Sequence, residues 1–420
     1  MIAARRRFLE QALGLGVLGF SGGILTATTR TRARLRDFRI RIVTSGPKHH
    51  FFGYYGICPW NESGQFLLSL ESDFQDHFPS PDEPVSIGLV DSETGEFSKV
   101  AESRAWNLQQ GAMLHWSPLC ADEIIYNDRR GNEIVSVVPN VKSGSRRLLP
   151  RPVSALSHNG RFALSLTYGR LRRLRKTVGY EGAEDPNPNS PHPDNDGVFL
   201  MNMATGKHKL IVSIEDVYRI LVKKHPELKH RHMWFNHTVF NRNDTRFFFL
   251  ARTRDNKGRL ETGMMTANLD GSELREVIPY GTRVSHFDWR NDRQIIATFA
   301  YKGQERKHIL FTDGKDDYEI VAGQFFAGDG HCTFSPDQKW IATDQKHYGT
   351  LEQSLLAFNV ESNQGIVLAR LSMKEKRYIS GDLRCDFHPR WNRTGDAICF
   401  DALEAKSGTR QLHVAHLELG

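Results

Sequence analysis

Seven segments of the chain share one pattern of hydrophobic and polar positions. Each begins with an apolar or aromatic residue, passes through a turn with Asn, Asp or Gly, and continues as an alternating strand, as at Phe247 and Phe249. A period of two is typical of β-strands with one buried face, and the turn residues let the backbone reverse direction. Each segment therefore predicts a β-hairpin. The segments begin at Cys58, His115, Leu156, Phe235, Phe287, Cys332 and Phe387.

A second hairpin follows most of these segments, with two apolar strands around a polar turn that contains Gly. Examples are SIGLVDSETGEFSKV and SLLAFNVESNQGIVLA. Four strands per unit, repeated every ~40–50 residues, indicate a propeller rather than a sandwich. We therefore expect an all-β fold, a seven-bladed β-propeller. The last unit lacks one strand, and we expect the isolated strand at 38–44 to complete it and close the ring.

One interval, between Leu156 and Phe235, is too long for a single blade and predicts a helical and loop insertion. Residues 213–229 are expected to form a helix that Ser213 caps, with Asp216 at the third helical position. Residues 171–197 are rich in Pro and Asn and predict a long loop. Long ordered loops in compact domains are usually functional, so the insertion is expected to contribute to a site.

The N-terminal residues 1–36 differ from the rest of the chain and predict a signal peptide with a basic spacer. Arg5 and Arg6 begin an RRxFL sequence, the twin-arginine form of bacterial export signals. The apolar run at 12–27 is rich in Gly and short for a membrane anchor. We expect residues 37–420 to form the propeller domain of a periplasmic or secreted protein, without stable membrane association after export.

Charge and cysteine content narrow the function classes. Residues 1–36 hold seven arginines and one glutamate, which account for +6 of the formal net charge of +7. The propeller is therefore nearly neutral, and a nucleic-acid partner is not expected. The cysteines are odd in number and show no CxxC spacing, which argues against a disulfide framework and favours free thiols. They are Cys58, Cys120, Cys332, Cys385 and Cys399.

Polar residues cluster where the predicted blades begin. Corresponding positions in different blades are neighbours around the axis, so we expect a ring of histidines, amides, tyrosines and arginines on one face. One such histidine is often structural, but six contributing blades favour a functional site. His286 and His331 are the predicted metal ligands, and no organic cofactor is expected. Other members are His49, His50, Tyr54, Tyr55, Gln109, Gln110, His115, Asn236, His237, Asp288, Asp329, Arg384, Asp386, His388 and Arg390.

Several long phrases resemble, in the same order, the seven-bladed propeller polysaccharide lyases that cleave ulvan. They include KHHFFGYYG, AWNLQQGAMLHW, HMWFNH, GHCTFSPDQKWIATD and RCDFHPRWNRTG, and the likeness runs from about residue 45 to the end of the chain. The chain is also similar, more distantly, to the oligogalacturonate lyases. One departure is that Gly56 and Ile57 follow GYY, where the ulvan phrase continues with Asp and Lys.

The resemblance implies β-elimination at a uronic acid in an acidic polysaccharide or oligosaccharide. A cation must neutralise the uronate carboxylate, a base removes the C5 proton and an acid protonates the leaving oxygen. The implied catalytic residues are His237, Tyr180, His115 and Arg252, with Arg254 and Arg384 as other candidates for neutralising the carboxylate. The basic run at 170–176 is either a solvated face or a second contact for the anionic glycan. The implied substrate-binding residues are His50, Tyr55, Gln110, Asn236, Arg384 and Arg390.

The resemblance further implies a divalent metal ion, with zinc, manganese and calcium as the candidates for the histidine site. Two other functions stay open at this point. A non-catalytic, TolB-like propeller that binds a periplasmic protein or glycan would show the same blade pattern. Hydrolysis by paired carboxylates would require two of Asp288, Asp344 and Asp386 to meet near the axis.

Overall fold

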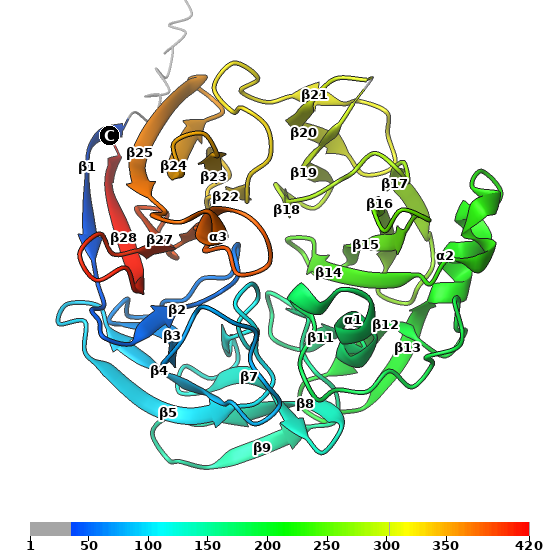
Figure 1. The fold of residues 1–420 in the computed structure, drawn as a ribbon, viewed down its shortest axis with the longest axis horizontal. Helices are drawn as coiled ribbons and strands as arrows, with labels where there is room; N and C mark the ends of the chain where they lie inside the picture. Colours follow the sequence, from blue (N-terminus) through cyan, green and yellow to red (C-terminus); the bar gives the residue numbers. More distant parts are fainter. Residues whose placement is uncertain (1–34, 302, 420) are drawn as a thin grey trace, which may run out of the picture. The chain divides into compact units, whose positions relative to one another are not determined.

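The computed structural model of the protein describes residues 35–301 and 303–419. In this part of the chain, seven four-stranded antiparallel sheets surround a common axis (Figure 1). The predicted all-β, seven-bladed β-propeller is therefore confirmed. The predicted signal peptide lies outside the described residues, apart from the two residues at 35 and 36. No helix in the described ranges is long and apolar enough to cross a membrane.

In blades 1 to 6 the four strands follow chain order from the axis outward (Figure 1). Blades 1 and 2 contain β2 (His49–Phe51), β3 (Phe66–Ser72), β4 (Val85–Asp91), β5 (Phe97–Ser103), β6 (His115–Trp116), β7 (Ile124–Arg130), β8 (Glu133–Pro139) and β9 (Arg146–Leu149). Blades 3 and 4 contain β10 (Ala155–Leu156), β11 (Phe162–Ser165), β12 (Gly197–Asn202), β13 (His208–Ser213), β14 (Trp234–Phe240), β15 (Arg246–Arg254), β16 (Leu260–Asn268) and β17 (Arg275–Ile278). Blades 5 and 6 contain β18 (Phe287–Trp289), β19 (Gln294–Ala300), β20 (Arg306–Thr312), β21 (Glu319–Ile320), β22 (Thr333–Phe334), β23 (Trp340–His347), β24 (Glu352–Asn359) and β25 (Gln364–Ser372).

The seventh blade is built from both ends of the propeller. Its strands β26 (Arg390–Trp391), β27 (Ala397–Leu403) and β28 (Arg410–Leu419) come from the C-terminal end, and β1 (Leu35–Ile42) adds the outermost strand. In the register of this antiparallel pair, Phe38 faces Leu417. The prediction that the N-terminal strand closes the ring is confirmed.

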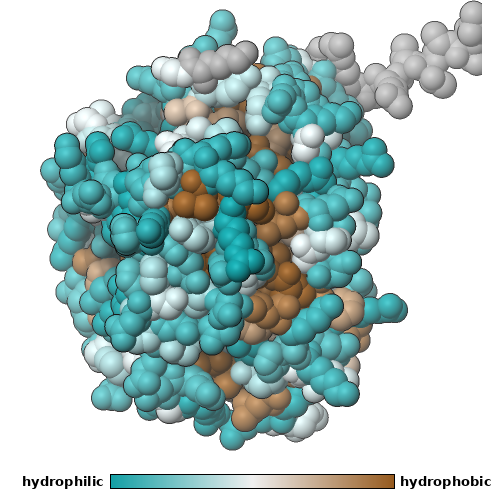
Figure 2. All heavy atoms as spheres, turned by 90° about the vertical axis from the view of Figure 1, so that its right-hand side faces the viewer, coloured by the Kyte–Doolittle hydropathy of each residue, from teal (hydrophilic) through white to brown (hydrophobic). Residues whose placement is uncertain are grey.

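Apolar side chains fill the space between neighbouring blades. Phe248 of β15 and Trp289 of β18, for example, stack with ring centroids 5.5 Å apart across the contact of blades 4 and 5. Hydrophilic residues cover most of the side of the molecule that lies to the right in Figure 1, and hydrophobic residues form narrow patches between them (Figure 2). The cysteines in the described ranges are free thiols, as predicted, and Cys332 is buried in the core.

The predicted insertion lies in and after blade 3. Between β11 and β12 it forms α1 (Tyr168–Leu174) and the 3₁₀ helix η1 (Lys176–Val178), which the sequence pattern did not predict. After β13, the predicted helix appears as α2 (Ile214–Leu221), with the Ser213 capping box formed as expected. The helix is shorter than predicted because Pro226 starts a separate 3₁₀ helix, η2 (Pro226–His230).

The basic run at 170–176 mostly stabilises the insertion itself. Arg170 is buried and donates hydrogen bonds to backbone carbonyls, including that of Met233 at 2.8 Å. Arg172 and Arg173 pair with Glu181 and Asp185, respectively. The prediction of a merely solvated basic face is therefore wrong for these residues.

Candidate functional site

The axial segment, residues 52–57, follows the inner strand β2 of blade 1 and reaches the centre of the ring. Tyr54 contacts His237 of blade 4. Tyr55 contacts His286, His331 and His388, which precede the inner strands of blades 5, 6 and 7. Side chains of this one segment therefore meet four other blades at the axis.

Close backbone approach holds the axial segment in place. A Cβ atom on Gly53, where φ is 92°, would lie 2.5 Å from the backbone nitrogen of Gly111. Only glycine fits such an approach in the left-handed region without strain. The amides of Phe52 and Gly53 donate to the carboxylate of Asp401, which also pairs with Arg390 at 2.7 Å. Arg390 in turn donates to the carbonyl of Tyr54.

Two cavities lie along the axis, and Tyr54, Tyr55 and Phe287 line both of them. The cavity where the inner strands begin, here called the upper cavity, has a volume of about 410 Å³ and collects most of the predicted polar ring. The lower cavity lies where the inner strands end. The polar and aromatic lining of the upper cavity is Tyr54, Tyr55, Gln109, Gln110, Arg175, His237, Arg252, Ser285, His286, Arg306, Asp329, His331, Lys346, Tyr348, Ser380, Asp382, Arg384 and His388.

His237 reaches the upper cavity through a bulge in β14. The pairing with β15 is irregular between Asn236 and Val239, and His237 itself has a φ of 58°. This left-handed conformation is uncommon outside glycine and places two successive side chains toward the axis. His237 lines the upper cavity and the next residue, Thr238, lines the lower one.

Among the described residues, the His237 ring makes hydrogen bonds through Nδ1 alone. Its Nδ1 lies 2.9 Å from the hydroxyl of Tyr54 and 3.3 Å from the side-chain amide nitrogen of Gln110. Burial, together with the nearby charge of Arg252, lowers the pKa of His237 well below its ordinary value. The imidazole is therefore neutral near pH 7, the form that can accept a proton.

Arg252 of β15 is a buried cation without a partner. Its side chain lies in the upper cavity with 6% exposure, and it makes no hydrogen bond or ion pair within the described residues. Burial, with a smaller effect of the nearby Arg175, lowers the pKa of Arg252 to about 9. The guanidinium thus stays charged at neutral pH. A charge in this state costs free energy unless a ligand pairs with it, which makes Arg252 an anion-binding group.

A second unpaired guanidinium lies in the same cavity. Arg175, at the end of α1, has no carboxylate partner among the described residues, and its Nε is buried without a hydrogen bond. The other cations of the lining have carboxylate partners: Arg306 pairs with Asp329 at 2.5 Å, and Arg384 and Lys346 both pair with Asp386, at 2.7 and 2.5 Å. The cavity is therefore built for an anion in the region of Arg175 and Arg252.

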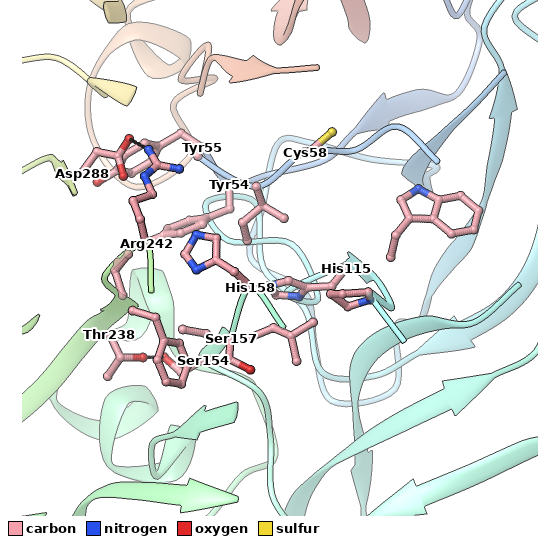
Figure 3. Close-up of a pocket in the computed structure, with 18 of the residues that line it drawn as sticks. Tyr54, Tyr55, Cys58, His115, Ser154, Ser157, His158, Thr238, Arg242 and Asp288 are labelled. Carbon is pink, nitrogen blue, oxygen red and sulfur yellow. Dashed lines mark hydrogen bonds and ion pairs between the residues drawn. The ribbon is translucent and has the colours of Figure 1, made fainter. Parts of the chain in front are cut away.

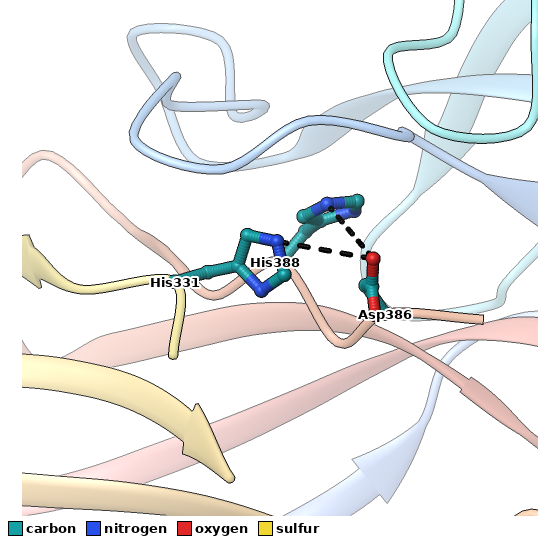
Figure 4. Close-up of side chains that lie close together, drawn as sticks. All are labelled: His331, Asp386 and His388. Carbon is teal, nitrogen blue, oxygen red and sulfur yellow. Dashed lines mark ion pairs between the residues drawn. The ribbon is translucent and has the colours of Figure 1, made fainter. Parts of the chain in front are cut away.

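Three buried side chains form a group with metal-ligand chemistry: His331 and His388 line the upper cavity, and Asp386 is buried next to them. One ligand atom each of His331, Asp386 and His388 lies within 4.8 Å of the others (Figure 4). The Oδ2 atom of Asp386 is 3.8 Å from Nε2 of His331 and 3.9 Å from Nε2 of His388. Burial alone would raise the pKa of Asp386, but Arg384 and Lys346 outweigh it and hold the pKa well below its ordinary value. The carboxylate is ionised, as a metal ligand must be.

His331 of this group and the neighbouring His286 are oriented as metal-binding histidines usually are. Nδ1 of His331 lies 2.9 Å from the carboxylate of Asp344, and Nδ1 of His286 lies 2.9 Å from that of Asp329. A carboxylate on Nδ1 keeps that nitrogen protonated and leaves Nε2 free to bind a metal. The ring of His286 is 3.7 Å from that of His331, between centroids. This donor set fits manganese or zinc better than calcium, which prefers oxygen ligands.

The upper cavity brings together seven of the predicted site residues. His237, Arg252, Tyr55, Gln110 and Arg384 line it together with the predicted metal ligands His286 and His331. The same cavity also holds Tyr54, Asp329 and His388 of the predicted ring.

Three predicted catalytic or polar residues lie elsewhere. Tyr180 is fully buried, stacked on Tyr168 with ring centroids 4.2 Å apart, and its hydroxyl accepts a hydrogen bond from Asn127. His115 lines the lower cavity instead. Asn236 is 1% exposed and lines neither cavity, because the bulge turns its neighbour toward the axis. The structure corrects the placement of all three.

Two predicted substrate-binding residues are structural in this arrangement. His50 bonds Gln411 and Glu71 between blades 1 and 7. Arg390 is fully buried and anchors the axial segment, as described above. Arg254, the alternative neutralising arginine, donates to the carbonyl of Gly258 on the surface. None of these side chains lines the upper cavity.

The carboxylates considered for hydrolysis do not share a cavity. Asp288 lines the lower cavity, and its carboxylate accepts hydrogen bonds from Arg242, Thr333 and the backbone amide of Phe334. Asp344 is hydrogen-bonded to Nδ1 of His331, and Asp386 forms ion pairs with Arg384 and Lys346. This arrangement does not support hydrolysis by paired carboxylates.

Arg175 and Tyr348 of the cavity lining had no site role in the sequence prediction. Arg175 lies in the basic run, where nothing distinguished it from its paired neighbours. Tyr348 is 63% exposed and lines the cavity, so its ring can stack on a ligand. Asp386 and His388 were expected in the polar ring, and their spacing of two residues in DFH was a signal for a shared ligand.

No family model and no curated protein sequence matches this chain. Solved structures are similar in fold. An oligogalacturonate lyase in complex with manganese matches with a TM-score of 0.63 and 14% identity, over 90% of this chain and 93% of that one. An oligogalacturonate lyase from Vibrio parahaemolyticus matches with a TM-score of 0.61 and 13% identity, over 91% and 97%. The propeller domain of the Trilobed protease from Pyrococcus furiosus has a TM-score of 0.52 and 9% identity, over 88% and 97%.

These matches support a lyase-like propeller fold, with two oligogalacturonate lyases among the neighbours. At such low identity the likeness concerns the fold alone. The resemblance to ulvan lyases stays a prediction.

Proposed function

We propose that this protein is a lyase that cleaves a uronate-containing glycan by β-elimination. The observation that carries the proposal is the buried Arg252, which has no partner among residues 35–301 and 303–419 and shares a cavity with the neutral His237. β-Elimination needs this combination, because the C5 proton of a uronate becomes acidic only when a cation neutralises the neighbouring carboxylate. A neutral imidazole can then remove it.

The two unpaired guanidiniums define where the substrate lies. Arg252 receives the carboxylate of the sugar that reacts, because it is the one next to His237. Arg175 receives a second anionic group, which favours a substrate with charges on adjacent sugars. The exposed ring of Tyr348 lines the same cavity and gives the apolar face of a sugar a surface for stacking.

Tyr54 and His237 together can move both protons of the reaction. In the productive tautomer Nδ1 of His237 donates to the Tyr54 oxygen, with the Gln110 amide turned so that its oxygen and not its nitrogen faces Nδ1. Nε2 then takes the C5 proton. Tyr54 gives its own proton to the leaving O4 atom and regains one from Nδ1 of His237. Burial raises the pKa of Tyr54 above its ordinary value, so the hydroxyl starts protonated. The C5–H and C4–O4 bonds break, a C4–C5 double bond forms, and the proton count is balanced.

The residues that would hold a divalent metal are His331, His388 and Asp386, with His286 next to them. One oligogalacturonate lyase of similar fold is in complex with manganese, which supports a divalent metal at this site. A metal bound here supplies a positive charge for an oxygen of the substrate.

The direct test is to incubate the purified protein with oligogalacturonates, polygalacturonate, ulvan and other uronate glycans, and to follow ultraviolet absorbance. The unsaturated uronate product absorbs where the substrates do not. We expect absorbance to grow with one substrate class and to be lost in Arg252→Gln. Tight binding of a glycan or a protein without product would favour the non-catalytic alternative, and hydrolysis without a double bond would refute elimination.

We also propose that the protein leaves the cytoplasm by the twin-arginine route. The supporting observations are the RRxFL sequence and the free thiols of the propeller, which need no oxidising compartment to fold. Fractionation of a bacterial host that expresses the full chain tests this proposal. A double substitution of Arg5 and Arg6 by Lys should retain the protein in the cytoplasm, and unchanged export would refute the route.

A further inference from the structure

The lower cavity is a second chamber that the proposed reaction does not use. It has a volume of about 230 Å³, smaller than the ~300–1,000 Å³ of sites for drug-sized ligands, so it suits one small molecule. Its walls come from the inner strands of blades 2 to 5, the axial segment and Arg393 of blade 7, and Figure 3 shows Tyr54, His115, His158 and Arg242 around the same space. Tyr54 and Tyr55 separate it from the upper cavity.

The deep part of the lower cavity offers a buried hydrogen-bond acceptor. His115 is 8% exposed, and its Nδ1 lies 2.9 Å from the carbonyl of Met113, so this nitrogen carries the proton. Burial lowers the pKa of His115 to about 4, which keeps the ring neutral. Its Nε2 is then an acceptor with no protein partner in the described residues. A ligand hydroxyl is the group that this nitrogen can bind.

The outer part of the lower cavity is positively charged. Arg393 lies at the exposed mouth and donates to the carbonyl of Trp60 at 3.3 Å, with no carboxylate within ion-pair distance among the described residues. Arg242 donates from Nε to the carbonyl of Trp289 and from Nη2 to Asp288, and its Nη1 has no partner in the part of the chain that the structure describes. Asp288, the one acidic residue of the described lining, already receives three hydrogen bonds. The mouth therefore favours an anion.

Apolar and aromatic side chains complete the walls between these two polar ends. Trp116, Phe240 and Phe287 line the cavity together with the ring of Tyr54. A ligand for this space needs a compact body with an apolar face, a hydroxyl group at its inner end and a negative charge at its outer end. The chemistry that fits is a hydroxylated carboxylate of monosaccharide size.

We propose that the lower cavity is a second binding site, for a small hydroxylated carboxylate. The ligand places its carboxylate between Arg393 and Arg242 and a hydroxyl on Nε2 of His115. It lies directly behind the ring of Tyr54, whose hydroxyl bonds His237 on the other side. The site is distinct from the proposed reaction site and does not depend on lyase activity.

The alkylation rates of two cysteines can show whether a ligand occupies the lower cavity. Cys58 lines the lower cavity and is partly exposed, whereas Cys120 is partly exposed and lies outside its lining. The full protein is alkylated with a small thiol reagent in the presence of galacturonate, malate, galactose or no addition, and each cysteine is followed by mass spectrometry. Galacturonate tests a sugar acid, malate an acyclic hydroxy acid, and galactose the hydroxyl groups without the carboxylate.

We expect at least one of the two acids to slow alkylation of Cys58 severalfold at millimolar concentration, with Cys120 unchanged. Protection by galacturonate and not by malate would identify a sugar acid as the ligand. Protection by malate and not by galacturonate would identify an acyclic hydroxy acid. Protection should persist in Arg252→Gln, which disables the upper cavity. In Arg393→Gln and in His115→Gln, the apparent affinity of the acid measured by this protection should fall at least about tenfold. Arg393→Gln is a surface change that leaves folding intact.

Three results would overturn the proposal. They are no protection of Cys58 by either acid, equal protection by galactose, or protection that disappears in Arg252→Gln but persists in Arg393→Gln and His115→Gln. Thermal unfolding of each variant shows whether it is folded before the comparison is made.

Discussion

The hydroxyl of Tyr54 lies 2.9 Å from Nδ1 of His237, although the two residues come from opposite sides of the ring, blades 1 and 4. The contact depends on the axial segment, which carries Tyr54 to the centre, and on the bulge in β14, which turns His237 to meet it. Because Nδ1 is engaged, Nε2 is the nitrogen that faces a ligand in the upper cavity.

Replacing Tyr54 by Phe removes the hydroxyl and keeps the ring. We expect the rate of product formation to fall about 10²- to 10⁴-fold, the usual contribution of a positioned acid or base, with a smaller change in KM. The measurement is steady-state ultraviolet absorbance on the best substrate. Tyr301→Phe, away from both cavities, is the matched control and should keep its activity. An unchanged kcat in Tyr54→Phe would remove Tyr54 from the proposed proton relay.

Arg252→Met should make the protein more stable and inactive at the same time. The substitution replaces an unpaired buried charge by an apolar side chain of similar length, which should raise the free energy of unfolding by about 0.5–2 kcal/mol. Loss of the carboxylate partner should cost about 10²- to 10³-fold in rate. Thermal unfolding and kinetics measure the two effects.

Arg254→Met is the control for this experiment, because Arg254 lies two residues away on the same strand and is exposed. It should change neither property appreciably. A clear loss of stability in Arg252→Met would mean that the guanidinium is paired in the folded protein, contrary to the structure.

Manganese or zinc should raise the melting temperature of the protein, and a chelator should reverse the effect. In His388→Ala we expect this shift to disappear. In Asp344→Asn, which leaves the ligand His331 in place but weakens its orientation, the metal affinity should fall about 10- to 100-fold. Metal titration followed by thermal unfolding measures both. Asp313→Asn removes a carboxylate that pairs with Arg246 far from the cluster and should leave metal affinity unchanged.

Tyr180→Phe tests the catalytic role that the resemblance implied for this residue. In the structure its hydroxyl accepts one hydrogen bond from Asn127 and does not reach the upper cavity. We therefore expect nearly full activity and a loss of about 1 kcal/mol in the free energy of unfolding. Loss of activity by more than about tenfold, with the fold intact, would restore Tyr180 as a catalytic candidate.

Acid should destabilise the protein partly through His115. Burial lowers the pKa of His115 from 6.5 to about 4, so between these values the unfolded chain binds a proton that the folded chain does not. Stability therefore falls as the pH drops from about 6.5 to 4, by up to about 3 kcal/mol from this group, and the contribution is constant outside this window.

His115→Gln removes this titration and should flatten the dependence of the unfolding free energy on pH in that window. Denaturant unfolding at several pH values measures it. Replacement of the exposed His77 by Gln is the control, because His77 is not buried in the core. An equally steep dependence in His115→Gln would show that other groups cause the acid destabilisation.

The sequence by itself determined the architecture. The alternating strands between Cys58 and Leu419, the turn residues and the missing strand of the last blade were enough to predict seven blades and their closure by the N-terminal strand. Capping of α2 by Ser213 was predicted for a similar reason. These features depend on local periodicity and on residue types at neighbouring positions, which a single sequence displays directly.

The residues at the starts of the blades were predicted as a group but not one by one. His286 and His331 precede their inner strands and face the upper cavity, whereas His115 is the first residue of β6 and faces the lower one. A shift of one residue in an extended chain turns a side chain to the other face, and the alternation does not specify where a loop ends and a strand begins.

Only the tertiary structure decided which side chains meet at the axis. Tyr54 reaches His237 through a non-strand segment, and Arg175 enters the cavity from the junction of the unpredicted α1 and η1. Tyr180 is turned into the core by the same insertion. Contacts between distant parts of the chain leave no periodic signal in the sequence. The fold follows from local pattern, while the site follows from how the ring closes around the axial segment.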